Sequence, residues 1–331
     1  MDLDAYTAAH RDDWDKLSRL ARQRRLDGRE ADELIYLYQS GATDLSVIKT
    51  QAGSTATGDR LSVALASARL RFTGAGANLF SQLPRFFVLQ LPAALYRIRW
   101  LVLAVAVATV IVATLYAIWI AGNPDVLANL GADAQLRRYV EHDFIDYYSN
   151  NPAASFSGQV WTNNAWIAAQ CIAFGITGVY VPYVLLQNAI GVGTAAGVMF
   201  AYGRGDVMFS YILPHGLLEL TSVFVAAAAG LRIFWAWIAP GARTRAQALA
   251  EDGRALFTVA IGCAITLFVS GIIEGFVTPS SLPVWAKIAI GVVALGAFLA
   301  YMLVLGRRAV RAGETGDLTE YEAGSRRVVA G

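Results

Sequence analysis

The sequence is poor in the residues that build metal centres, disulfide frameworks and soluble surfaces. Its 331 residues include two cysteines, three histidines and nine prolines, and 16% of them are charged. Soluble domains carry about 25% charged residues, so the composition is not that of an ordinary soluble enzyme. Cys171 and Cys263 both lie in apolar stretches. This placement excludes a disulfide framework or a cysteine zinc motif, and it predicts two small core residues.

Common hydrolase motifs are also absent. The chain has neither a His-Glu-x-x-His pair nor a Gly-x-Ser-x-Gly elbow. A zinc hydrolase of the His/His/Glu type needs a second histidine beside His215, and only His10 and His142 remain. His142 could fold over His215, but nothing in the sequence requires it. The sequence therefore predicts no cofactor, no assigned catalytic residue and no nucleic-acid partner, and we do not expect an enzyme.

The sequence contains several long apolar runs. The 22 residues from Trp100 to Ala121 contain no charge. A bilayer core needs about 20 apolar residues in a helix, so this run predicts a transmembrane span. Similar runs follow it, and the lipid bilayer is the first partner that the sequence predicts. The predicted fold class is all-α, a polytopic membrane protein with about six transmembrane helices at 100–121, 159–186, 188–203, 211–238, 255–277 and 284–306.

The residues before the first span are different in kind. Residues 1–80 are rich in charge, and their apolar residues recur at helical spacing, which predicts a cytoplasmic region of about three short amphipathic helices. Residues 81–99 mix Phe86, Phe87 and leucines with arginines and two prolines. That mixture predicts an interfacial helix along the membrane, with the prolines separating it from the first span.

Positive charge near the spans predicts the orientation. With six spans, nine arginines fall on one side and four basic residues on the other, so both termini are predicted to be cytoplasmic in the cell membrane. The polar segment 122–158 then becomes an extracytoplasmic loop, and residues 307–331 become a cytoplasmic tail. The segment 188–203 is short and glycine-rich, and it is either a full span or a re-entrant segment.

Ionisable residues inside the spans define the predicted site. His215 and Glu219 are spaced i, i+4 and share a helix face. The topology places Asn163, Asn164 and Glu274 at a similar depth. Isolated polar groups in lipid cost too much, so we expect these five side chains to solvate one another, in a water-filled cavity or at a helix interface.

Three interpretations of this polar cluster stay open. It is a structural hydrogen-bond network, a pocket for a ligand or ion, or a site of intramembrane chemistry. As metal ligands, His215, Glu219 and Glu274 are weak candidates, and no metal is predicted. The matching functions are a non-enzymatic component that organises partners, a transporter or channel-like protein that binds a lipid, small molecule or ion, and an intramembrane hydrolase.

Small residues predict close helix packing. Gly193 and Gly197 form a GxxxG pair, Gly191 adds a third small site, and Gly216 follows His215. Glycine faces often continue across a two-fold axis, so we expect a homodimer. We also expect a tight hairpin at Gln187–Asn188.

Several stretches together resemble the stage II sporulation protein M family of multi-spanning membrane proteins. They are WTNNAWIAAQCIAFGITGV, NAIGVGTAAG, ILPHGLLELTSVFVAAAAG and IIEGFVTPSSLP, and LIYLYQSGATDLSVIKTQ in the N-terminal region resembles its bacterial members. The resemblance covers residues 10–306. The family's motif residues correspond to Asn163, Asn164, His215, Gly216, Glu219, Glu274 and Pro279 here.

The resemblance implies a membrane component of the cell envelope rather than an enzyme. The founding member works with a peptidoglycan hydrolase and another membrane protein in spore formers. Related actinobacteria often encode such proteins beside MoxR-type ATPases and small RDD-domain membrane proteins. The partners it implies are therefore other envelope membrane proteins or a MoxR-type ATPase, in envelope or peptidoglycan remodelling.

Overall fold

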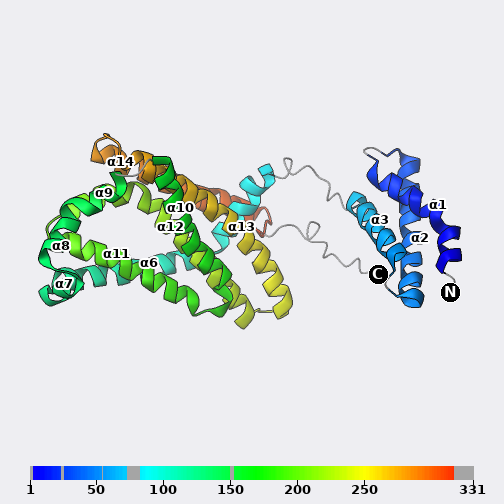
Figure 1. The fold of residues 1–331 in the computed structure, drawn as a ribbon, viewed down its shortest axis with the longest axis horizontal. Coiled ribbons are helices and arrows are strands. Elements are labelled where there is room, and N and C mark those ends of the chain that lie inside the picture. The colour runs from blue at the N-terminus through cyan, green and yellow to red at the C-terminus, as the bar shows by residue number, and fades with distance from the viewer. Residues whose placement is uncertain (1–2, 24–25, 54, 73–82, 150–152, 317–331) are drawn as a thin grey trace. The chain divides into compact units, whose positions relative to one another are not determined.

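The chain folds into two compact units. A computed structural model describes residues 3–23, 26–53, 55–72, 83–149 and 153–316 (Figure 1). One unit holds the N-terminal helices and the other runs from Pro84 to Thr319. Every regular element in the described residues is helical, which confirms the predicted all-α class. The residues at 81–82 that open the predicted interfacial helix, and the predicted tail beyond 316, lie outside the described residues.

Three amphipathic helices form the N-terminal unit. They are α1 (Leu3–Arg22), α2 (Gly28–Ala52) and α3 (Ala56–Phe72). Their apolar faces close over a core of leucines with Trp14 and Ile48. The carboxylate of Asp44 is buried in this unit, where it accepts hydrogen bonds from the Tyr6 hydroxyl at 2.8 Å and the Trp14 indole at 2.9 Å. The unit therefore has its own core and its own satisfied polar group.

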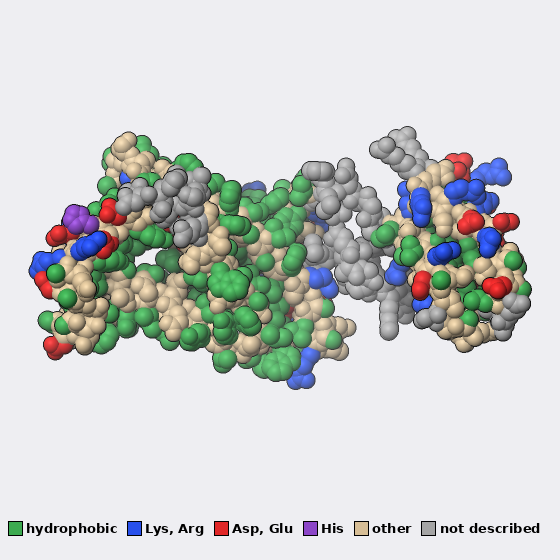
Figure 2. Space-filling model, in the orientation of Figure 1, with side chains coloured by type: hydrophobic (Ala, Val, Ile, Leu, Met, Phe, Trp, Pro, Cys, Tyr) green, Lys and Arg blue, Asp and Glu red, His purple; other side chains and the backbone are tan. Residues whose placement is uncertain are grey.

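Five helices of the second unit are long and apolar enough to cross a membrane, counting only the described residues. They are α6 (Arg99–Ala121), α11 (Tyr180–Ala201), α12 (Gly205–Ile238), α13 (Arg245–Ile272) continued by the π-helical η4 (Ile273–Val277), and α14 (Val284–Ala300) continued by η5 (Tyr301–Leu305) and α15 (Gly306–Arg311). Hydrophobic side chains cover most of this unit in Figure 2, whereas charged side chains gather on the N-terminal unit. The membrane class predicted from the sequence is confirmed.

Helix α12 is the central helix of this unit. In the apolar 18-residue stretch of α12, 67% of the residues are buried. The corresponding share is 22% for α6 and 17% for α14 with its continuation. Its small residues Ala226–Ala229 are almost fully buried and allow neighbours to approach closely. The outer helices expose valines, leucines and tryptophans, as expected for helices that face lipid.

Helices α6 and α11 lie side by side and run parallel. Gly193 approaches Ala113 and Tyr116, and one turn later Gly197 approaches Ala117 and Ile120, so both residue numbers rise together. Parallel neighbours require the chain to return between them. Helix α10 (Ala153–Ala173) provides that return, and it packs beside α12 and α13 (Figure 1).

The turn before α11 lies earlier than the sequence predicted. Helix α11 runs unbroken through Gln187 and Asn188, so the predicted hairpin at those residues is wrong. The chain turns instead at 174–179, where Gly178 adopts φ of 71° and Gly175 packs against the backbone of Gly230 with no room for a Cβ. A positive φ and a close approach of two backbones both favour glycine. Residues 188–201 of the predicted segment 188–203 are therefore part of a 22-residue helix long enough to cross.

The segment before the first span also differs from expectation. Pro92 is accommodated at the start of α5 (Leu91–Arg97), directly after the π-helical η1 (Phe86–Gln90), and the break before α6 falls at Ile98. A proline needs no N–H partner in a first helical turn, so Pro92 does not break the segment. Leu91 to Leu95 are buried against α13, α15 and η5.

The predicted loop 122–158 is largely helical where it is described. It contains α7 (Pro124–Leu130), α8 (Asp133–Arg138), η2 (Tyr139–Asp143) and α9 (Phe144–Ser149), which gather at one end of α6 and α11 (Figure 1). Val140, Phe144 and Tyr148 are buried and belong to one hydrophobic cluster with Met199 and Met208.

Candidate functional site

A seam of polar contacts joins α12 to α13 along their length. The two helices are antiparallel, since Arg232 pairs with Asp252 at 3.4 Å at one end while His215 meets Glu274 at the other. Between these ends the hydroxyls of Ser222 and Thr266 lie 2.7 Å apart. The seam fixes the register of the helices, and it places the ionisable residues of both on one interface.

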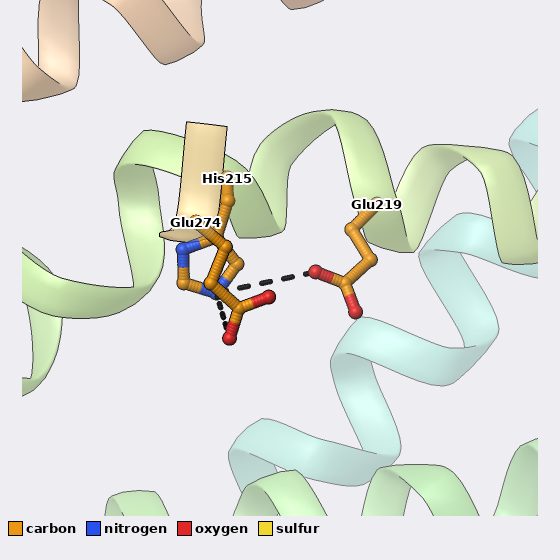
Figure 3. A group of neighbouring side chains, drawn as sticks. All are labelled: His215, Glu219 and Glu274. Carbon is orange, nitrogen blue, oxygen red and sulfur yellow. Dashed lines mark ion pairs between the residues drawn. The ribbon is translucent and has the colours of Figure 1, made fainter. Parts of the chain in front are cut away.

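Three of the five predicted cluster residues meet at the His215 end of this seam. Figure 3 shows the carboxylates of Glu219 and Glu274 directed toward the imidazole of His215. The Nε2 atom of His215 lies 3.9 Å from Oε2 of Glu219 and 3.6 Å from Oε1 of Glu274. One donor atom from each residue lies within 4.8 Å of the others. An imidazole and two carboxylates at these distances could hold a metal ion or share a proton.

The three side chains are enclosed. The exposed fraction is 6% for His215, 3% for Glu274 and 13% for Glu219. The cluster therefore sits in a helix interface, which is one of the two settings that the sequence left open. The Oε2 atom of Glu274 is buried and has no hydrogen-bond partner among the described residues.

Neighbouring hydroxyls hold the histidine in place. The Nδ1 atom of His215 lies 3.2 Å from the Thr278 hydroxyl, and the Ser270 hydroxyl donates to the His215 carbonyl at 3.0 Å. The ammonium of Lys287 in turn donates to the Thr278 carbonyl at 2.7 Å. With Nδ1 engaged in this way, Nε2 is the nitrogen that faces the carboxylates.

The helix α9 covers the histidine. The ring of Tyr148 lies 5.9 Å from the imidazole and 5.2 Å from Tyr211, and its side chain is buried. Burial, with the nearby Glu274 carboxyl adding to it, raises the pKa of the Tyr148 phenol, which stays neutral. His142, which was weighed as a cover, is exposed on η2.

The two asparagines of the predicted cluster differ in burial, and their place in the cluster stays a prediction. Asn163 is exposed on α10 and Asn164 is half-buried there. Helix α10 does pack against α13, and Trp161 donates to the Ala264 carbonyl at 3.3 Å. Helix α10 also packs against α12 and against η4, which carries Glu274.

The predicted packing glycines have different surroundings. Gly193 and Gly197 contact α6 within this chain, so this GxxxG face is already occupied. Gly191 has open space where a Cβ would lie, whereas a Cβ at Gly216 would lie 2.8 Å from the Ile212 side chain of its own helix. Close approach through glycine is also made by Gly291, where a Cβ would lie 2.5 Å from the Pro214 carbonyl oxygen.

Sequence reasoning named Glu274 but missed Ser270, Thr278 and Tyr148, which surround the histidine. Ser270, Glu274 and Thr278 are spaced i, i+4, i+8, and this spacing already placed them on one helix face. Tyr148 carried no such signal, because its position depends on how α7 to α9 fold back. The fourth span was predicted to begin at residue 211, but α12 begins at Gly205, so Pro214 lies inside the helix and not in its first turn. His215 is therefore about 15 Å along the helix.

Comparison with known families agrees with this arrangement. The model of the stage II sporulation protein M family matches residues 101–279, which is more than half of the chain and contains the whole cluster. The chain belongs to the stage II sporulation protein M family. The N-terminal residues 4–74 match a second model, described as a domain of unknown function (DUF8413). Neither a curated protein nor a solved structure matched the chain.

Family membership confirms the resemblance drawn from the motifs. The matched region begins with α6 and ends two residues after η4, so it covers four of the five long apolar helices together with α10. The boundary between the two family models falls near the boundary between the two compact units. This stage II sporulation protein M relative is thus a membrane bundle joined to a separate helical unit.

Proposed function

We propose that this protein is a non-enzymatic membrane component of the cell envelope that organises partner proteins in envelope or peptidoglycan remodelling. The observation that carries the proposal is the division into two units with separate cores. A tightly packed membrane bundle anchors the chain, and a polar three-helix unit of this size is suited to docking. Other envelope membrane proteins and a MoxR-type ATPase are the proposed partners, on the family resemblance.

The N-terminal unit offers an apolar contact surface. Val63 and Leu70 of α3 are 62% and 55% exposed, and their spacing of seven places them on one face of the helix. Ile35 and Tyr36 of α2 are also exposed. Exposed apolar groups on an otherwise charged helical unit are typical of an interaction site.

The proposed topology has six crossings, with α10 as the second and both termini in the cytoplasm. The parallel pairing of α6 and α11 supports an intervening crossing. Two of the arginines predicted to be cytoplasmic, Arg97 and Arg99, support the orientation, because they line one cavity of about 390 Å³ together with Arg232 and Val310. Positive charge gathers in this way on the cytoplasmic side of membrane proteins.

Cross-linked capture from native membranes tests the docking function. The full-length protein is expected to retain one defined envelope protein or ATPase, and the double variant Val63→Ser/Leu70→Ser is expected to lose it. Gln39→Ser, at an exposed position of α2, is the matched control and is expected to retain the partner. Equal capture by the wild type and the double variant, or no reproducible partner at all, would contradict the proposal.

A second candidate function is favoured by the buried ionisable cluster. Ionisable groups inside a membrane bundle are commonly sites of ion or proton movement, so a transporter or channel-like activity is the alternative, and an intramembrane hydrolase would use the same three side chains. Purified protein in sealed vesicles distinguishes these functions. A cation flux or a hydrolysed substrate that depends on Glu219 would favour the alternative over the docking function.

A further inference from the structure

We infer that His215, Glu219 and Glu274 bind one divalent metal ion, which links α12 to the end of α13. Two of the three donors lie one turn apart on α12, and the third comes from the π-helical η4. Their donor atoms converge on one point within the interface (Figure 3). This binding site goes beyond the proposed docking function and does not depend on it.

The cluster does not satisfy itself through hydrogen bonds. The two distances from His215 Nε2, at 3.6 and 3.9 Å, are longer than a hydrogen bond. Glu274 Oε2 is fully buried and unpartnered among the described residues. A buried acceptor without a partner costs roughly 1–3 kcal/mol, and more when it is charged. A cation bound between the carboxylates removes that cost.

The spacing fits a metal ion with little movement. Ligands bound at about 2.0–2.1 Å in tetrahedral geometry lie roughly 3.3–3.4 Å apart. The observed separations from His215 Nε2, 3.6 and 3.9 Å, exceed this by roughly 0.2–0.6 Å, which small side-chain rotations can close. The longest separation in the group, within 4.8 Å, needs a larger rotation of one glutamate.

The surroundings of the histidine are those of a metal ligand. A metal-bound histidine commonly uses its second ring nitrogen in a hydrogen bond that fixes its orientation. The Thr278 hydroxyl occupies that position at His215 Nδ1, and the Thr278 carbonyl is itself held by Lys287. Thr278 and Lys287 thus help to hold the imidazole of His215 in place beside the two carboxylates.

The donor set selects the class of metal. One imidazole and two carboxylates suit Zn²⁺, Mn²⁺ or Fe²⁺ and disfavour Cu⁺, which prefers sulfur ligands. Cys263 lies about three turns from Glu274 and contacts the Ser222 carbonyl at 3.6 Å, so it is not a ligand. Three protein ligands leave a further position for water.

Metal content and thermal stability test the site directly. The full-length protein, purified in detergent without a polyhistidine tag, is treated with chelator, re-exposed to Zn²⁺ or Mn²⁺ and freed of excess metal. We expect about one equivalent per chain by elemental mass spectrometry, together with a higher unfolding midpoint than in chelator. Glu274→Gln keeps the shape of the side chain and is expected to weaken binding about tenfold or more.

A control on the same seam separates metal binding from folding. Asp252→Asn alters another buried carboxylate of α13, which is paired with Arg232 and Arg243, and it is expected to retain the metal. The inference is overturned if the well-dispersed wild type binds no metal and shows no metal-dependent midpoint. It is also overturned if Glu274→Gln binds as the wild type does, which would indicate an adventitious ion only.

Discussion

At the scale of single residues, several buried polar groups at the α12–α13 interface meet a neighbour on the other helix. Ser222 meets Thr266, Asp252 meets Arg232, and Ser270 donates to the His215 carbonyl. Bonds of this kind are worth about 0.6 kcal/mol on average within membranes. Their number along one interface matters more than any one of them. The Glu274 carboxylate departs from this pattern, because one of its oxygens has no partner in the described residues.

Two substitutions of Glu219 separate shape from charge. Glu219→Gln keeps the volume and the hydrogen-bonding capacity, so its unfolding midpoint in chelator is expected to stay near that of the wild type. Glu219→Leu removes one polar neighbour of the buried His215 imidazole and is expected to destabilise the protein by about 1–3 kcal/mol. Thermal unfolding in detergent measures both, with Glu141→Leu at an exposed position of η2 as the control. Equal damage by Gln and Leu would mean that the fold itself requires the charge.

The residues that the sequence could identify are those whose neighbours are set by helix periodicity. His215 and Glu219 share a face at i, i+4, and the opposed direction of their two helices brings Glu274 to them. Asn163 was placed in the same layer by depth alone, and depth does not determine which way a side chain points. Tyr148 depends on a long-range fold-back that no local pattern encodes.

At the scale of helices, glycine determines which pairs approach closely. Gly193 and Gly197 bring α11 against α6, Gly291 brings α14 against Pro214 of α12, and Gly230 receives the end of α10. The helices themselves were predictable from apolar runs, but their ends were not. Gly175 and Gly178 end α10 and form the turn, yet they look like any other small residues inside an apolar stretch.

Adding one methyl group to these glycines tests the packing. At Gly193 a Cβ would lie 2.7 Å from the Ala113 carbonyl oxygen, so Gly193→Ala is expected to destabilise the protein by about 1–3 kcal/mol. Gly191→Ala, two residues away on the open face, meets nothing within 4 Å and is expected to be neutral or slightly stabilising. Unfolding midpoints in the same detergent measure the difference, and equal midpoints would contradict the parallel pairing of α6 and α11.

The same glycines bear on the predicted homodimer. Because α6 already covers the Gly193–Gly197 face, a second copy of the chain would have to use another surface. Gly191 is exposed on α11 and lies on a surface that is free in the single chain. The homodimer stays a prediction, and its glycine argument now depends on Gly191 alone.

At the scale of the whole molecule, the order of helices and the charge between them support the proposed topology. Helix α12 spans 34 residues, about 51 Å, and so is longer than a bilayer core. Its length means that hydropathy alone cannot place its ends, and the predicted start at 211 was six residues late. The parallel α6 and α11 provide the stronger constraint, because α10 must carry the chain back between them.

Cysteine labelling at three exposed positions decides whether α10 crosses the membrane. Ala9 lies on α1, Asp206 at the start of α12 and Ala246 at the start of α13, and the native cysteines are buried, which keeps the background low. Gln247 is avoided because it completes the α13 cap with Thr244. An impermeant thiol reagent on intact cells is expected to label Asp206→Cys but neither Ala9→Cys nor Ala246→Cys, which react only after permeabilisation. If positions 9 and 206 are both protected while 246 is labelled, α10 does not cross, and the His215 cluster belongs to the cytoplasmic half of the membrane.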